Sequence, residues 1–153
     1  MSTRSTTHFV ERDRVAAIVY RHSDGYPEAA GADLLDFFAQ VKEQTQDTRF
    51  YDPTYLAAKY VVFLAGMFAL SATYGPDADG KWAEHPENVK PLNFISVGVM
   101  LEDPGNIEFR YLVHCDKQVD GRPEVTVQEV RFSDKGAKNL GEVAEVLKQP
   151  VAD

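Results

Sequence analysis

The stretch YLAAKYVVFLAGMFALSATY, residues 55–74, decides the fold because it is apolar almost without interruption. About 20 residues of this kind are enough to cross a lipid bilayer. Lys59 inside the run and the polar residues Ser71 and Thr73 near its end count against a membrane span. The pair Asp52-Pro53, just before the run, supplies a helix N-cap and a favoured first helical residue. We therefore expect a buried helix, apolar nearly all round, that forms the spine of the core.

Outward from this helix, the hydrophobic pattern predicts a second helix and several strands. From Ala32 to Gln44, apolar residues recur at helical spacing on one side and charged residues occupy the other, which indicates an amphipathic surface helix. The region from Tyr74 to Pro91 is rich in glycine and proline, so we expect a surface loop there. The remaining segments are β-rich runs at residues 5–10, 15–20, 94–101, 107–114 and 124–132, and a short C-terminal helix at 140–148.

The resulting order, ββααβββα, predicts an α+β fold. A short charged turn joins the two strands that precede the helices, and a turn at residues 102–106 joins the first two strands that follow them, so we expect two hairpins. Because the two helices are inserted together, we expect a single antiparallel sheet of about five strands with the two main helices packed on one face. The sequence contains no repeat and no linker, which predicts one domain over residues 1–153.

The composition is that of an acidic, soluble, globular protein. Hydrophobic residues make up 44% of the chain and charged residues 26%, values close to the globular average. The formal net charge of −8, from 24 acidic and 16 basic side chains, repels phosphate polymers and anionic membrane surfaces. We therefore expect neither nucleic acid nor a membrane as a partner, whereas the formation of a homo-oligomer stays open.

The cysteine content and the N-terminus bear on the compartment. Cys115 is the single cysteine, so no intrachain disulfide can form and a reducing compartment is favoured. Residues 1–7 lack the apolar core that a secretory signal requires. Both observations predict a cytoplasmic location.

One segment, Tyr20 to Pro27 with the sequence YRHSDGYP, gathers several chemically active side chains after a predicted strand. Turns of this kind expose polar groups to ligands. Arg21 could hold an anion, Tyr20 or Tyr26 could stack on a ligand, and a pair formed by His22 and Asp24 could exchange protons or hold a metal ion. The sequence therefore predicts a binding site for an anionic small molecule or a protein partner, formed by Arg4, Tyr20, Arg21, His22, Asp24 and Tyr26.

A purely structural interpretation of the same segment stays open. Asp24 would cap the turn, Gly25 would supply a left-handed residue, and Pro27 would stiffen the chain. His22 would then only bond to nearby backbone groups.

The chain also resembles a known family in its first quarter. The tripeptide Ser2-Thr3-Arg4, the signature Tyr-x-His-x-Asp-Gly-Tyr-Pro over residues 20–27, and Gly31 before a helix resemble a family of small uncharacterised bacterial and phage-associated proteins. Members often carry Glu-Gly after the proline, whereas residues 28–30 here are Glu-Ala-Ala. The resemblance implies kinship and an association with mobile elements, but no reaction.

Two other functions stay open. Removal of Met1 would free the amine of Ser2, which could activate its own hydroxyl as in N-terminal nucleophile hydrolases, and His22 with Asp24 could form another hydrolytic site. The apolar strands also suit a structural or oligomerising domain. The sequence contains no metal-ligand spacing and no phosphate-binding glycine loop, so we expect no metal and no cofactor. Without a complete catalytic constellation, a non-enzymatic binding protein is favoured.

Overall fold

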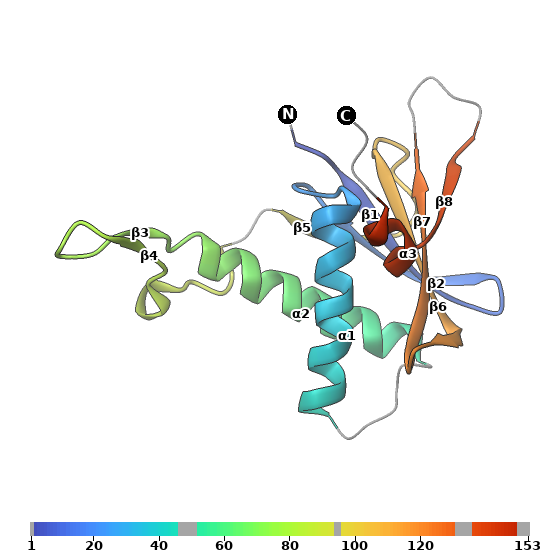
Figure 1. The fold of residues 1–153 in the computed structure, drawn as a ribbon, viewed down its shortest axis with the longest axis horizontal. Coiled ribbons are helices and arrows are strands. Elements are labelled where there is room, and N and C mark those ends of the chain that lie inside the picture. The colour runs from blue at the N-terminus through green and yellow to red at the C-terminus, as the bar shows by residue number, and fades with distance from the viewer. Residues whose placement is uncertain (1, 46–51, 94–95, 131–135, 150–153) are drawn as a thin grey trace.

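The computed structural model describes residues 2–45, 52–93, 96–130 and 136–149, and its fold is α+β (Figure 1). Within these residues there are three α-helices, a six-stranded sheet and a two-stranded sheet. The strands are β1 (Ser5–Glu11), β2 (Arg14–Arg21), β3 (Gly75–Pro76), β4 (Trp82–Ala83), β5 (Val97–Met100), β6 (Phe109–Val119), β7 (Arg122–Glu129) and β8 (Lys138–Glu142). The helices are α1 (Ala32–Gln44), α2 (Pro53–Ser71) and α3 (Val143–Lys148), with a π-helical turn at Pro27–Gly31 and a 3-10 turn at Pro86–Asn88.

The large sheet has the strand order β5-β2-β1-β6-β7-β8. Strands β1 and β6 are parallel, whereas the other neighbouring pairs are antiparallel. The sheet is therefore mixed and six-stranded, and the prediction of an antiparallel sheet of about five strands is wrong in these two respects. The first predicted hairpin, β1 with β2, is confirmed. Residues 94–95 and 131–132 of the predicted strands lie outside the described residues.

The second predicted hairpin does not form, because β5 pairs with β2 and β6 pairs with β1. The loop between β5 and β6 folds across the sheet instead of turning tightly. Asp103 in this loop accepts a 2.7 Å hydrogen bond from Nε of Arg110, and its Oδ2 lies 3.5 Å from Nε2 of His8 on β1. Ile107 at the end of the loop is fully buried. These contacts anchor the loop on the sheet and carry the chain from the edge strand β5 to the central position of β6.

The last part of the chain also differs from the prediction, because residues 138–142 form β8 and the helix begins only at Val143. Gly141 lies within β8, opposite Val127 and beside a register shift, and has a φ of 116°, a conformation that favours glycine. Glu142 then caps α3, since its Oε1 accepts a 3.0 Å hydrogen bond from the backbone N–H of Ala144. The region from Tyr74 to Pro91, predicted as a loop, contains only the two-residue strands β3 and β4 and the 3-10 turn.

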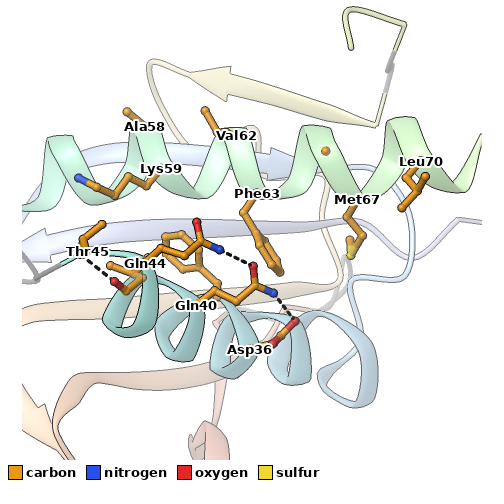
Figure 2. A pocket seen from close by; sticks show the side chains of 13 residues that line it. Asp36, Gln40, Gln44, Thr45, Ala58, Lys59, Val62, Phe63, Met67 and Leu70 are labelled. Carbon is orange, nitrogen blue, oxygen red and sulfur yellow. Dashed lines mark hydrogen bonds between the residues drawn. The ribbon is translucent and has the colours of Figure 1, made fainter. Parts of the chain in front are cut away.

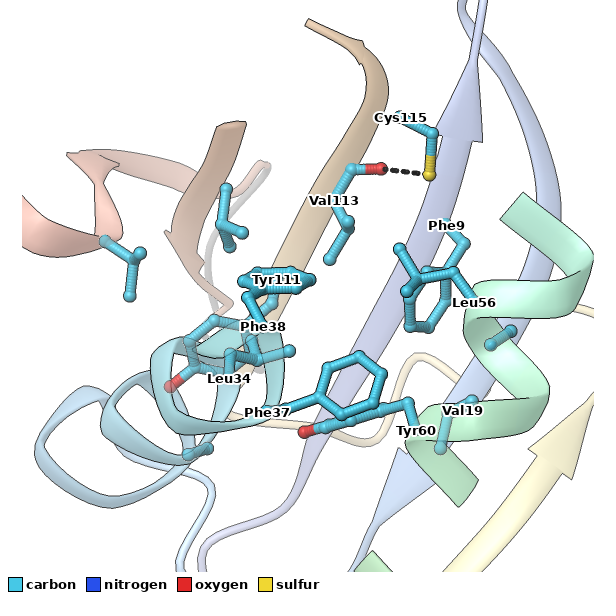
Figure 3. Packing of buried hydrophobic residues seen from close by; sticks show 14 of the residues in the cluster. Phe9, Val19, Leu34, Phe37, Phe38, Leu56, Tyr60, Tyr111, Val113 and Cys115 are labelled. Atoms are coloured by element: carbon cyan, nitrogen blue, oxygen red, sulfur yellow. Dashed lines mark hydrogen bonds between the residues drawn. The ribbon is translucent and has the colours of Figure 1, made fainter. Parts of the chain in front are cut away.

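The helices α1 and α2 pack on one face of the sheet, as predicted (Figure 1). The core between them is rich in aromatic rings: Phe37 lies 5.1 Å from Tyr60 between ring centroids, and Phe9 lies 5.9 Å from Tyr60 (Figure 3). Other buried members of this core are Val19, Leu34, Phe38, Leu56, Leu64, Tyr111, Val113, Cys115, Val125 and Val127. Alternation along the strands places the strand members of this core on the face that the helices cover and their chain neighbours on the opposite face.

Helix α2 begins as predicted: Asp52 accepts hydrogen bonds from the backbone N–H groups of Thr54 and Tyr55, and Pro53 is the first helical residue. However, α2 is buried on one side only. Leu56, Tyr60 and Leu64 are at most 1% exposed, whereas Val62 is 72% exposed. By length and composition alone, α2 is long and apolar enough to cross a membrane, and 28% of its most apolar 18-residue stretch is buried in the structure. The expectation of a buried core helix is therefore confirmed for one side of α2 only, because the sheet and α1 cover only part of its circumference.

Candidate functional site

Three of the six residues predicted to form a ligand site, Tyr20, Arg21 and His22, are divided between the two faces of the sheet. Thr6 pairs with Tyr20, and Ser5 pairs with Arg21, on strands β1 and β2. Successive side chains of a strand point to opposite faces, so Arg21 lies on the core face and Tyr20 on the opposite face. His22 lies beside Tyr20, because the Tyr20 hydroxyl is 2.8 Å from Nδ1 of His22. The structure thus brings Tyr20 and His22 together and separates them from Arg21.

Arg21 is 4% exposed, and its guanidinium contacts Asp33, Ser23 and Phe68 inside the protein. Nη1 lies 2.7 Å from Oδ2 of Asp33 on α1, and Nε donates a 2.7 Å hydrogen bond to the carbonyl oxygen of Ser23. Its Cζ atom lies 5.2 Å from the ring centroid of Phe68 on α2, which is a cation–π contact. Arg21 therefore ties the end of β2 to both helices, and Asp33 already neutralises its charge.

The turn that follows is held by close packing around Gly25. A Cβ atom at Gly25 would lie 2.7 Å from Cβ of Ser5 and 2.9 Å from the carbonyl oxygen of Thr3, so only glycine fits. The N–H of Gly25 donates to the Thr3 carbonyl at 2.9 Å, and the buried hydroxyl of Tyr111 donates to the Gly25 carbonyl at 2.6 Å. Burial raises the pKa of Tyr111, which keeps this phenol protonated and able to donate. Close packing and hydrogen bonds therefore hold the Asp-Gly turn, which follows β2, against the core.

The other residues of the predicted ligand site lie in or near this turn. Asp24 is exposed and has a φ of 56°, a left-handed conformation that aspartate tolerates in turns. Tyr26 is 38% exposed and precedes the π-helical turn. Arg4 is half-buried, and its backbone N–H donates a 2.6 Å hydrogen bond to Oε2 of Glu108. The hydrogen bonds of this segment thus join its own backbone to β6 and α1, and its role in binding a ligand stays a prediction.

The hydrolytic and metal-binding alternatives gain no support from the described residues. Ser2 is exposed, and Met1 lies outside the described residues. No group of three or more His, Cys, Asp or Glu side chains that could hold a metal ion is present in the part of the chain that the structure describes. Burial raises the pKa of Cys115 to about 12, so its thiol is protonated at neutral pH and is a poor nucleophile.

A groove between α1 and α2, which the sequence interpretation missed, has a mainly apolar lining. Its volume is about 730 Å³. Phe37 and Val41 from α1 and Phe63 and Met67 from α2 give it an apolar base, and Val62 stands at its edge (Figure 2). None of the six predicted ligand-binding residues lines it.

One wall of the groove is polar and one is apolar. On α1, Nε2 of Gln40 donates to Oδ2 of Asp36 at 3.1 Å, and Nε2 of Gln44 donates to Oε1 of Gln40 at 3.5 Å, so these side chains form a row along the rim (Figure 2). Of the described residues that line the groove, only Asp36 and Lys59 carry a charge. Apolar side chains make up most of the rest of the lining, as in sites that bind apolar ligands or partners.

A signal for this groove is present in the sequence. Ala58, Val62 and Gly66 recur at every fourth position on α2, and so do Leu56, Tyr60 and Leu64. The two series are offset by two residues, which places them on opposite sides of the helix. One series fills the core, and the other leaves an apolar stripe at the surface.

No protein-family model, no curated protein and no solved structure matches this chain. The resemblance of its first quarter to a phage-associated family therefore stays a prediction, and the functional argument depends on the geometry of the chain itself.

Proposed function

We propose that this protein is a non-enzymatic binding protein that holds an apolar α-helix of a protein partner in the groove between α1 and α2. The observation that carries the proposal is the 72% exposure of Val62 in the middle of a helix that is apolar nearly all round. An exposed apolar stripe beside an apolar groove is typical of a protein interaction site.

The dimensions of the groove suit a helix. Its lining runs from Ala58 to Leu70 along α2, which at 1.5 Å per residue is roughly 18 Å, or about three helical turns. Ala58 and Gly66 have small side chains, and a Cβ atom placed on Gly66 would meet nothing within 4 Å. A partner helix could therefore approach the backbone of α2 closely, as ridges-into-grooves packing requires.

The groove is favoured over the Tyr20–Pro27 turn because the groups at the turn already have partners. An anionic ligand at Arg21 would have to displace Asp33, which lies 2.7 Å from the guanidinium, and would have to enter a position that is 4% exposed. Removing a charge from such a pair is costly. Capture of an anionic small molecule at the turn, the phage association and the cytoplasmic location stay predictions.

A binding measurement with a designed helix tests the proposal. The probe is a fluorescently labelled, helix-stapled peptide of about four turns with leucine and alanine on one face, and a scrambled peptide of the same composition is the control. We expect fluorescence anisotropy to show saturable binding of the amphipathic peptide only, and Val62→Glu to abolish that binding. Leu92→Glu, at a leucine that is 92% exposed and does not line the groove, is the matched control and should bind normally. Equal binding of both peptides, no binding at a protein concentration at which the chain is monomeric, or unchanged binding to Val62→Glu would count against the proposal.

A further inference from the structure

The two charges that line the groove lie at opposite ends of it. Lys59 lies at the end where α1 finishes, near Thr45, and Asp36 lies at the other end, near Met67 (Figure 2). The side chain of Asp36 is exposed. Nζ of Lys59 lies 5.9 Å from the ring centroid of Tyr55. The face of the groove is thus apolar in the middle, positive at one end and negative at the other.

A surface with this arrangement is complementary to itself. A two-fold axis that lies in the face and is perpendicular to the line from Lys59 to Asp36 carries each charge onto the position of the other. A second copy placed by that axis would set its Asp36 over the first copy's Lys59 and its Lys59 over the first copy's Asp36. The same residues would contact each other reciprocally, as in the isologous interfaces of two-fold dimers.

From this symmetry we propose that the helix held in the groove is α2 of a second copy of this chain. The inference depends on the proposed function, because it names the partner of the same groove. The two α2 helices would run in opposite directions over the groove, with the exposed Val62 of each copy in the interface. The small residues Ala58 and Gly66 allow the two backbones to approach closely.

The apolar stripe and the charges have different tasks in such a dimer. The apolar stripe supplies most of the affinity, because exposed ion pairs contribute little on their own. The two Lys59–Asp36 pairs select the antiparallel orientation, since a parallel crossing would place like charges together. The dimer would also cover the part of α2 that the fold leaves open.

A charge-exchange series tests the inference on the full chain by sedimentation velocity and light scattering over a range of concentrations. We expect the wild type to be a dimer and Val62→Glu to weaken dimerisation by at least about 100-fold, since it buries a charge in the apolar centre of the interface. Lys59→Glu and Asp36→Lys should each weaken it by about 3- to 10-fold, and the double variant should recover to within about 2-fold of the wild type. Leu92→Glu should dimerise normally.

Each other result overturns a defined part of the argument. A monomeric wild type that still binds the stapled peptide would overturn self-association and leave the proposed function standing. A dimer that is insensitive to Val62→Glu, in a protein that does not bind the peptide, would overturn both. The last experiment is flotation with vesicles of phosphatidylcholine. If the wild type floats with the vesicles and Val62→Glu does not, the apolar stripe binds a membrane, and both the proposed function and the dimer are overturned. Failure of the double variant to recover would overturn the antiparallel orientation.

Discussion

Replacing Asp33 with alanine would leave the Arg21 guanidinium buried without its carboxylate, and this substitution tests whether the YRHSDGYP segment is structural. Arg21 is 4% exposed, and its Nη1 lies 2.7 Å from Oδ2 of Asp33. After the substitution, the guanidinium would keep its hydrogen bond to the Ser23 carbonyl and its contact with the Phe68 ring. Neither contact supplies a negative charge.

The expected loss follows from the burial of the two partners. Removing one partner of a fully buried ion pair costs about 3–5 kcal/mol. The side chain of Asp33 is 26% exposed, so water can partly hydrate the orphaned guanidinium, and we expect Asp33→Ala to lower the free energy of unfolding by about 2–3 kcal/mol. For a chain of this size that corresponds to a decrease in Tm of roughly 5–10 °C.

Replacing Arg21 instead of Asp33 should lower the free energy of unfolding by less, and this difference between the two variants is the stricter test. Arg21→Met removes the buried charge, keeps a long side chain against Phe68, and leaves Asp33 at a position that water reaches. We expect a loss of about 1 kcal/mol. The double variant Arg21→Met/Asp33→Ala should be more stable than Asp33→Ala alone, because no charge then stays buried without a partner.

Urea unfolding followed by far-ultraviolet circular dichroism is the appropriate assay. Trp82 is 62% exposed on the small hairpin and would report poorly on the core. The measurement should be made in the Val62→Glu background, so that self-association does not contribute to the apparent stability. A loss below about 0.5 kcal/mol for Asp33→Ala, or a larger loss for Arg21→Met than for Asp33→Ala, would refute the structural account of Arg21.

Two further predictions concern other positions. Gly25→Ala should destabilise the fold by about 2 kcal/mol in thermal unfolding, because the new Cβ would overlap Ser5 and the Thr3 backbone. Gly66→Ala lies in open space on α2 and should stabilise the Val62→Glu background by about 0.5–1 kcal/mol in the same measurement. Burial lowers the pKa of His8 from 6.5 to about 4, although the nearby Asp103 acts in the opposite direction. As the pH decreases, the unfolded chain therefore takes up a proton on this histidine before the folded chain does. The free energy of unfolding should fall by up to about 3 kcal/mol between pH 6.5 and pH 4. His8→Gln should flatten that part of the pH profile, and an unchanged profile would contradict the assignment.

Local signals in the sequence predicted the local structure well. The apolar spacing from Ala32 to Gln44 predicted α1 with the bounds that the structure has, and Asp52-Pro53 predicted the start of α2. Each of these signals acts within a few residues of the chain. The first hairpin is local in the same sense, since only a short turn separates β1 from β2.

The parts that failed depend on contacts between distant residues. The parallel pairing of β1 with β6 joins Ser5 to Phe109, and no pattern within either strand specifies the direction or identity of its partner. Strand β8 has the sequence KNLGE, which contains no β-branched or aromatic residue, and pairing with β7 determines its conformation. Tertiary context overrides propensity in both cases.

The separation of Arg21 from Tyr20 and His22 follows from a pattern already present in the sequence. The three residues have compatible chemistry, but consecutive residues of a strand point to opposite faces of the sheet. Alternation alone assigns Arg21 to one face and its two neighbours to the other. A buried arginine at the end of a strand then needs a carboxylate from a covering helix, and Asp33 in the first turn of α1 supplies it.

The apolar helix α2 allows an inference about a partner, because the fold does not cover all of its apolar surface. A helix that packs on a sheet beside one other helix can bury only the sides that face them, so α2 has more apolar surface than two neighbours can cover. Leu56, Tyr60 and Leu64 account for the covered side, and Ala58, Val62 and Gly66 form a second apolar stripe opposite to it. An apolar circumference on a helix at the surface of a two-layer fold therefore predicts a third layer. In the dimer that we propose, a second copy of the chain supplies that layer, and the charges at the two ends of the groove set its orientation.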